Sequence, residues 1–520
     1  MGREMTIREI LKQDKTVKES TVRQFVFGIC IGLYFILNLV FFLHHEPYRD
    51  EANVWLMAKY LSPVELLREI HYQGHPCLWY FLVMPFAKLG LPYRTIEILS
   101  FSIMLIAAFL FVQKGKLIGV AKIACLLSPI LVYFYPVIAR GYCLIVLLLV
   151  LVAIVYPKRF HKPVMYGLLL GLLVQADTIS VGLAGGLSIA WLLESLFQSC
   201  ITKKNRGAFR RAVMGLWIPL VSFFFWIVQM APEVGQIGGD HGSFSGESFF
   251  TDCKGYAYYM VERLTGWTSG FTFWFFIVLL AAGLILCVYS KNFTGLFVFL
   301  FSYAYMSIFS IVVYGLHIWH FISLAFTFFW MVWILQIDVE KRWEREKSTI
   351  SVPQKCLTLC ARYVLNALVV LFAVACFMHW NSEKEPSNLK EALRGVYSNA
   401  GETADFLKKN VPQDAIIVST NVAFDCSVLA FLDDYEMHYA TNGMPVNHAI
   451  YAGEELKSAT LEDIEGWISV QYPDTKTYYL IVSEATHLSD AKGLTEGTLL
   501  YESKISANRG ENYRIFQMNR

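Results

Sequence analysis

Long apolar runs fill most of the chain between residues 24 and 380. A helix of about 20 apolar residues spans the hydrocarbon core of a bilayer. Twelve runs are candidates for such helices: residues 24–43, 77–90, 95–112, 117–138, 142–156, 163–178, 179–199, 212–230, 272–290, 293–315, 318–336 and 361–380. This pattern predicts an α-helical, polytopic membrane protein with about 12 to 13 transmembrane helices.

Basic residues between the runs predict the orientation of the chain in the membrane. Residues 1–23 are polar and rich in Lys and Arg, and further basic breaks lie at 156–163, 201–211 and 340–347. Because Lys and Arg are enriched in cytoplasmic loops, we expect all four segments in the cytoplasm. The last run then carries residues 381–520 to the outer face. This orientation needs an odd number of spans, so we expect one split or missing element in the proline-rich region between 77 and 138.

The periodicity changes after residue 381. A helical pattern over 387–411 and another over 461–470 alternate with four strand-like runs. The strand-like runs are residues 415–420, 477–483, 498–503 and 513–518. This alternation predicts a compact, extracytoplasmic α/β domain over 381–520, which follows a transmembrane domain over 24–380.

Two long connections are predicted outside the membrane, residues 44–76 and the Gly-rich loop 231–255. The first contains a capping box from Ser62 to Glu65, which predicts a helix start. Two sets of apolar or amphipathic positions recur there at helical spacing: Ala52, Trp55, Leu56 and Lys59, then Val64, Leu67 and Ile70. We therefore expect two short helices that lie in the outer interface with their apolar faces toward the membrane.

Composition and charge support this division into two parts. The chain of 520 residues is 56% hydrophobic and 17% charged, which is too apolar for an ordinary soluble protein. Its net charge of +2 conceals an asymmetry, because residues 381–520 hold 12 Lys and Arg against 21 Asp and Glu, and residues 1–380 hold 32 against 21. We expect membrane lipids as partners and no nucleic acid.

An acidic pair follows the first apolar run, in the stretch "EPYRDEANVW" at residues 46–55. Asp50 could simply cap a helix that starts at Glu51, since Asp is a favoured N-cap. Acidic residues at the mouth of a helix bundle are otherwise costly unless they face a wet cavity. Neighbouring helical residues point about 100° apart, so one acid can face the cavity while the other binds a neighbour such as Arg49 or a metal.

Two further motifs follow in the same order as in a known superfamily. They are "GHPCLWYFL" at 74–82, which opens the second apolar run, and "SPILVYFYPVIARGYCL" at 128–144. Together with the acidic pair they resemble the GT-C superfamily of glycosyltransferases, in the branch of the protein mannosyltransferases and lipid A aminoarabinose transferases. His75 and Pro76 match the His-Pro-Pro-Leu type element of that branch, whereas Cys77 replaces its second proline.

The resemblance implies an inverting transfer of a sugar from a polyprenyl-phosphate donor to an extracytoplasmic acceptor, at the outer face of the cell membrane. Asp50 would be the general base, and Glu51 would bind acceptor or metal. Arg140, with Tyr142, Arg49 and His75, would bind the donor phosphate. The acceptor, whether protein, teichoic acid, another wall polymer or lipid, is left open, and so is a divalent metal.

Structural rather than catalytic roles are alternatives for the same residues. Arg140 could be an interfacial arginine that reaches lipid headgroups, and Glu51 a charge on the surface of a helix. Five further polar residues are candidates for lining a cavity: Asp177, His317, His320, Asp240 and His241. Asp177 could instead be a buried acid that hydrogen-bonds to Gln175 or Thr178. His317 and His320 could simply lie on an amphipathic helix, and Asp240 and His241 could lie in a solvated loop.

Two other functions are compatible with a polytopic chain. A carrier or flippase for a lipid-linked glycan would use the acids and histidines along a translocation path, although the sequence shows none of the symmetry between halves that inverted repeats produce. A non-catalytic anchor for the outer domain would not need a polar cluster on the first loop. Both remain alternatives to the glycosyltransferase.

Overall fold

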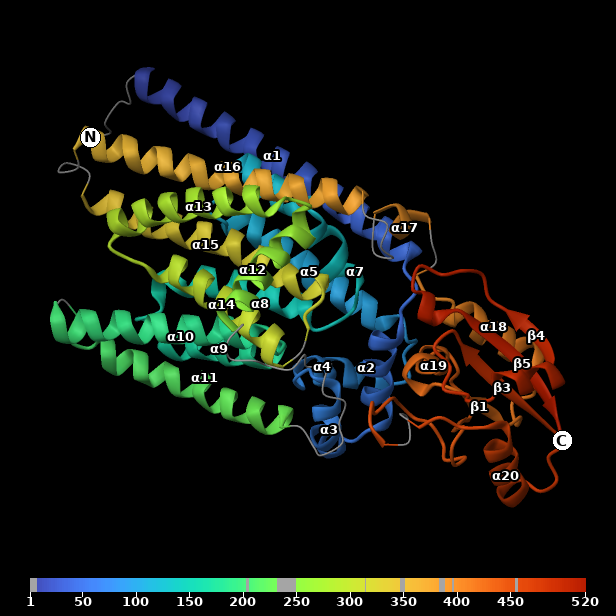
Figure 1. Ribbon diagram of the computed structural model, residues 1–520. Helices are drawn as coiled ribbons and strands as arrows, with labels where there is room; N and C mark the ends of the chain where they lie inside the picture. Colours follow the sequence, from blue (N-terminus) through green and yellow to red (C-terminus); the bar gives the residue numbers. More distant parts are fainter. Residues whose placement is uncertain are drawn as a thin grey trace.

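The structure is a computed structural model that divides into a long helical bundle and a smaller unit with a β-sheet at one end of it (Figure 1). It describes the chain except for residues 1–6, 203–204, 232–248, 314, 347–350, 383–388, 395–396 and 454–456. Side chains are described from residue 24 onward, apart from a few positions beside these segments and at residues 491, 492 and 509.

Each of the twelve predicted apolar segments coincides with helical structure in the bundle. Eight helices in the described residues are long and apolar enough to cross a membrane, or nine if a bent pair counts as one span. The eight are α1 (Ile7–His44), α5 (Thr95–Lys114), α10 (Ser180–Leu196, extended by η4, Phe197–Ile201), α11 (Ala208–Met230), α13 (Ser269–Ser290), α14 (Thr294–Val312), α15 (Ile318–Arg345) and α16 (Val352–Ser382). Three shorter apolar helices accompany them: α4 (Leu78–Lys88), α8 (Tyr142–Val155, extended by η3, Tyr156–Lys158) and α9 (Pro163–Ala176).

The split element lies in the predicted proline-rich region. Helix α6 (Gly119–Leu126) is followed by a π-helical turn, η2 (Ile130–Phe134), and by α7 (Tyr135–Val137), and the two parts meet at an angle of 49°. Pro129 lies at the bend, where it lacks a backbone N–H and cannot continue the hydrogen-bond ladder. The chain therefore turns here, and the residues after α7 lie near the end of the bundle.

The predicted Gly-rich loop is shorter than expected at its far end. Helix α12 (Phe249–Thr265) begins inside the range 231–255 and packs against α14, α15 and α16. Most of the remaining range, including Asp240 and His241, lies outside the described residues.

The C-terminal unit, by which we mean the described part of residues 397–520, has a five-stranded sheet in the order β2-β1-β3-β5-β4. The strands are β1 (Ile417–Ser419), β2 (Met437–Tyr439), β3 (Thr477–Ser483), β4 (Thr498–Glu502) and β5 (Tyr513–Asn519). Strands β2, β1 and β3 are parallel, whereas β5 runs antiparallel to both β3 and β4. The helices are α18 (Ala400–Asn410), α19 (Val422–Leu429) and α20 (Leu461–Gln471), with short turns η6 (Ala491–Glu496) and η7 (Arg509–Glu511), and α17 (Leu389–Arg394) precedes the unit.

The two faces of this sheet belong to different cores. Alternate strand residues point to opposite faces, so Leu480 packs with Trp467 of α20 in a small separate core. Ile481 on the other face belongs to the same buried apolar cluster as the helices of the bundle. One core therefore continues from the membrane helices into the C-terminal unit.

The first external connection lies between these two parts (Figure 1). It forms α2 (Arg49–Tyr60), α3 (Pro63–Glu69) and η1 (Ile70–Gln73). The interfacial arrangement predicted for α2 is wrong, because every residue from Glu51 to Ala58 is buried and α19 packs on the helix from outside. The predicted capping box is present in α3, but the buried residue of this helix is Leu66, and Val64 is 58% exposed. Ile70, the first residue of η1, is buried.

Candidate active site

Asp50 lies in the first turn of α2 and points at Arg140. Its Oδ2 is 2.8 Å from Nη1 of Arg140, and Oδ1 is 3.6 Å from Nε of Arg49. The hydroxyl of Tyr48 donates to Oδ2 over 3.4 Å. The N-cap of α2 is Tyr48, and the helix begins at Arg49. The alternative that Asp50 merely caps the helix is therefore wrong.

The surroundings of Asp50 keep its carboxyl group ionised. Burial alone would raise the pKa of Asp50, but the neighbouring cations, led by Arg140, lower it by more, so that the pKa is below its usual value. Arginine stays protonated at all physiological pH values. The pair is thus a carboxylate and a guanidinium in a site that is mostly shielded from solvent, with side-chain exposures of 27% and 10%.

Arg140 comes from the turn between α7 and α8, and the backbone of this turn is fixed on both sides. The N–H of Ala139 donates to Glu51 Oε1, and its carbonyl accepts from Trp79 Nε1 over 3.2 Å. Arg140 itself is only 8% exposed. An arginine that reaches lipid headgroups would extend into the interface, so this alternative is wrong.

Glu51 points away from Asp50 and is fully buried. Its Oε2 accepts from the backbone N–H of Tyr48 and from His45 Nε2, both at 3.0 Å, while Oε1 binds the amide of Ala139. The alternative of a surface charge is therefore wrong. Both carboxylate oxygens already accept hydrogen bonds from the protein, which favours a role in joining α2 to the turn of Arg140 over the role of an acceptor or metal ligand.

His75 and Asp177 form a second pair. Nδ1 of His75 is 2.9 Å from Oδ2 of Asp177, and the backbone N–H of Ile179 donates to Oδ1 over 3.0 Å. The alternative in which Gln175 or Thr178 satisfies Asp177 is wrong. Thr178 instead donates its hydroxyl proton to the carbonyl of Gly74, and Gln175 donates to Ser222. The turn between α9 and α10 is thereby tied to the residues just before α4.

Tyr142 connects this pair to the start of α15. Its ring makes edge-to-face contacts with His75, at 6.1 Å between centroids, and with His320, at 5.9 Å. His317 is the N-cap of α15, and its backbone N–H donates to Nδ1 of His320 over 2.9 Å. The two histidines thus form a helix cap beside Tyr142, with their ring centroids 6.1 Å apart.

The structure therefore brings most of the predicted site residues into one connected cluster, which includes Asp50 and Arg140. Asp240 and His241 lie outside the described residues. Sequence reasoning missed Tyr48, whose hydroxyl binds Asp50, and Tyr80, which lies close enough to Asp50 and Arg140 to interact with both electrostatically. Both tyrosines lie inside the motifs quoted above, and this position was the one signal in the sequence that they belong to the site.

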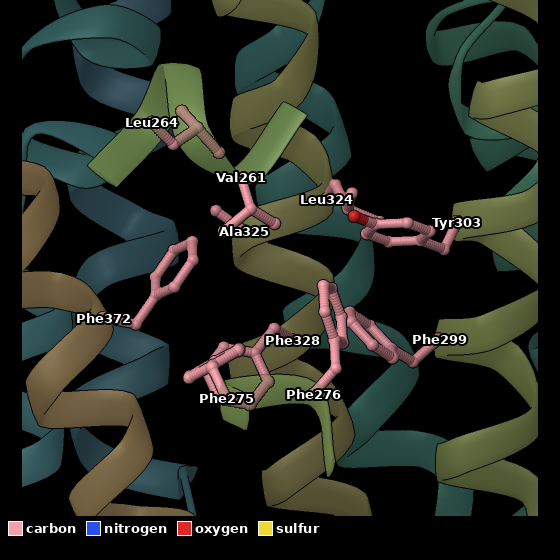
Figure 2. A pocket seen from close by; sticks show the side chains of 10 residues that line it. All are labelled: Val261, Leu264, Phe275, Phe276, Phe299, Tyr303, Leu324, Ala325, Phe328 and Phe372. Atoms are coloured by element: carbon pink, nitrogen blue, oxygen red, sulfur yellow. The ribbon is translucent and has the colours of Figure 1, made fainter. Parts of the chain in front are cut away.

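No group of three or more His, Cys, Asp or Glu side chains in the described part of the chain is arranged to hold a metal ion. One pocket lies deeper in the bundle, between α12, α13, α14, α15 and α16, and it is lined by aromatic and aliphatic side chains (Figure 2). Phe275, Phe299 and Phe372 are among them, and Tyr303 contributes the single hydroxyl. The polar cluster does not contribute to this lining.

No protein-family model and no curated protein sequence matches the chain. Among solved structures, ArnT from Cupriavidus metallidurans in the apo state is similar over 96% of this chain and 98% of its own, with a TM-score of 0.53 and 10% identity. The chain is similar in fold to ArnT. A second ArnT structure from the same organism, bound to undecaprenyl phosphate, aligns over 94% of this chain and 97% of its own at 9% identity and a TM-score of 0.48.

ArnT is a lipid A aminoarabinose transferase of the GT-C family. The similarity to ArnT confirms the predicted fold, a polytopic, mostly α-helical membrane protein with a small C-terminal sheet region. At 10% identity this comparison concerns the fold alone, and the chemistry of this chain has to be argued from its own residues.

Proposed function

We propose that the protein is a membrane glycosyltransferase that transfers a sugar from a polyprenyl-phosphate donor to an extracytoplasmic acceptor, with inversion at the anomeric carbon. The observation that supports this proposal best is the ion pair between the half-buried Asp50 and the buried Arg140, at the end of an ArnT-like bundle. A base for the acceptor and a cation for the leaving phosphate are the two groups that such a transfer needs.

The proposed reaction is a single displacement. The acceptor nucleophile attacks the anomeric carbon from the side opposite the phosphate, and Asp50 takes the proton that the nucleophile loses. The bond from the anomeric carbon to the phosphate oxygen breaks, and the lipid phosphate leaves with the electron pair. Arg140 stabilises the negative charge that develops on it, because a guanidinium binds phosphate oxygens in a bidentate manner.

The ion pair also suggests how the base is activated. While Arg140 pairs with Asp50, it lowers the basicity of the carboxylate. A bound donor phosphate competes for the same guanidinium, which has five N–H donors in a fixed fork. When the phosphate takes over part of these contacts, Asp50 becomes a better base. Donor binding would thus prepare the site for the acceptor.

The second pair and its aromatic neighbour would complete the donor site. We infer that Asp177 fixes the ring of His75, and that His75 and Tyr142 contact the phosphate or the sugar of the donor. Arg49 adds a further positive charge beside Asp50. His320, which contacts Tyr142, would shape the far wall.

The orientation of the chain follows from its charges. The connection from α10 to α11 and the end of α15 carry basic breaks and lie at the end of the bundle remote from the C-terminal unit (Figure 1). With these breaks in the cytoplasm, residues 1–23 are cytoplasmic, and residues 381–520 are extracytoplasmic beside the site. The C-terminal unit would then be a platform for the acceptor, whose class, whether protein, wall polymer or lipid, is left open.

The test supplies the purified protein in detergent with a polyprenyl-phosphate sugar and with a cell-envelope extract as the source of acceptor, and it measures the released polyprenyl phosphate by chromatography. We expect Asp50→Asn to lower the rate by at least about 100-fold with normal expression, because the general base is lost. Asp433→Asn is the matched control, since Asp433 lies at the same interface and its side chain is 73% exposed. A donor that is moved across vesicles but never consumed in detergent would favour a carrier, and unchanged glycans in cells with Asp50→Asn would favour an anchor.

A further inference from the structure

The residue next to the proposed base is held by the C-terminal unit. The backbone N–H of Arg49, the first residue of α2, donates to Glu511 Oε1 over 2.9 Å. Its guanidinium lies 4.1 Å from the centre of the Phe424 ring, and its carbonyl accepts from the thiol of Cys426 over 3.8 Å. These contacts join positions as far as 462 residues apart in the sequence.

Glu511 is itself firmly placed. It is fully buried at the end of η7, where Ser398 Oγ donates to Oε2 over 2.6 Å and Asn508 Nδ2 donates to Oε1 over 2.9 Å. The carboxyl group therefore cannot turn without breaking bonds within its own unit. Its position at the start of α2 is favourable, because the first amides of a helix have no partner inside the helix and carry partial positive charge.

A second contact lies one turn further along the same face of α2. Asn53 Oδ1 accepts from the backbone N–H of Ala449 over 2.7 Å, and Asn53 Nδ2 donates to the carbonyl of Ala449 over 2.9 Å. Residues four apart lie on one face of a helix. The C-terminal unit therefore holds α2 at two points on one face, while Asp50 faces the membrane helices.

We propose that Glu511 is a positioning residue for Asp50, and that the C-terminal unit sets the direction of the general base through the amide of Arg49. This proposal rests on the proposed glycosyltransferase function and goes beyond an acceptor platform. The N–H of Arg49 belongs to the peptide plane between Tyr48 and Arg49, which sets the direction in which α2 starts and therefore the direction of the Asp50 side chain one residue later. A displacement of about 1 Å at a reacting group can cost about 100-fold in rate, so a single hydrogen bond at this plane is sufficient to affect catalysis.

Three variants test the proposal in the full-length protein. Glu511→Ala removes the acceptor of the Arg49 amide, and we expect kcat to fall at least about tenfold while KM for the polyprenyl-phosphate donor changes less than about threefold. Glu511→Gln retains an oxygen that can accept from Arg49, so we expect it to restore kcat to within about threefold of the wild type. Asp433→Asn at the other end of α2 should behave as the wild type.

Hydrogen exchange of the peptide over residues 46–56, without substrate, gives a readout that does not depend on activity. We expect faster exchange in Glu511→Ala and unchanged exchange in Glu511→Gln. If Glu511→Ala does not fold, Ser398→Ala, which frees one oxygen of the carboxylate, should give faster exchange in its place.

The proposal is overturned if Glu511→Ala keeps kcat within threefold of the wild type, if exchange over 46–56 does not change in any variant, or if Glu511→Gln is as defective as Glu511→Ala. If the wild type consumes no donor at all, it is the proposed function that fails. The exchange measurement then still decides whether Glu511 holds α2.

Discussion

Arg140→Ala tests the centre of the proposed mechanism. In the wild type Nη1 of Arg140 lies 2.8 Å from Asp50 Oδ2, and the Arg140 side chain is only 10% exposed. Loss of a preorganised donor that stabilises transition-state charge typically costs about 100- to 1000-fold in kcat, or about 2.7 to 4 kcal/mol. Because Arg49 remains 3.6 Å from Asp50 and Asp50 is 27% exposed, we expect the lower end of this range, about 100-fold.

Arg140→Lys separates the charge from the geometry. Lysine keeps a positive charge but lacks the planar fork that binds two phosphate oxygens, so we expect a loss of about tenfold, between the wild type and the alanine variant. The assay is the initial rate at which the purified protein in detergent releases polyprenyl phosphate from saturating donor.

The double variant Asp50→Asn with Arg140→Ala is the strictest control. Both residues act on one reacting centre, so we expect the double variant to lose much less than the product of the two single losses. The reasoning is refuted if Arg140→Ala keeps kcat within threefold of the wild type. It is also refuted if the two losses multiply, because the two residues would then act independently.

Two further predictions concern stability. Glu51→Gln places an amide N–H₂ group against backbone N–H donors from which Glu51 accepts hydrogen bonds in the wild type. An unsatisfied buried donor costs about 1 to 3 kcal/mol, so the unfolding temperature in detergent should fall by several degrees. An unchanged temperature would contradict the role of Glu51 in joining α2 to the turn of Arg140. Burial raises the pKa of Asp425 to about 7, so the folded protein binds an extra proton and its stability decreases as pH rises from about 4 to 7. Hydrogen exchange over residues 417–429 at pH 5.5 and 8, corrected for the intrinsic rate, should show this dependence in the wild type and in Asp433→Asn. It should be reduced in Asp425→Asn, and an equal dependence in all three proteins would be the contrary result.

The membrane part of the fold could be predicted from the sequence because length and apolarity are local properties. The errors lie where helices continue beyond the apolar run: α15 extends to Arg345 and α16 begins at Val352, because hydrogen bonds continue a helix into water without any apolar signal. Strand β2 was missed because it has only three residues and depends on its pairing with β1.

The site could be predicted only in part. Asp50 and Arg140 came from the order of motifs, since no local pattern joins residues so far apart in the chain. Asp177 was predicted to line a cavity, or else to bind Gln175 or Thr178, and its contact with His75 was not predicted. Helix α9 ends at Ala176, and the change of direction there points the carboxylate at His75. Glu511 was missed altogether, because its contact with Arg49 forms only where the C-terminal unit packs on α2, 462 residues away in the sequence.

The burial of α2 between the bundle and the C-terminal unit has a consequence for biosynthesis. Ribosomes deliver α2 to the membrane early, whereas the residues that cover it, from 397 onward, are made after all the described membrane helices. Until then the contacts that Arg49 and Asn53 make with Glu511 and Ala449 in the finished fold cannot form. A nascent chain therefore passes through a stage in which the described membrane helices have been made but the site around Asp50 is incomplete. At this stage chaperones and proteases can act on the chain.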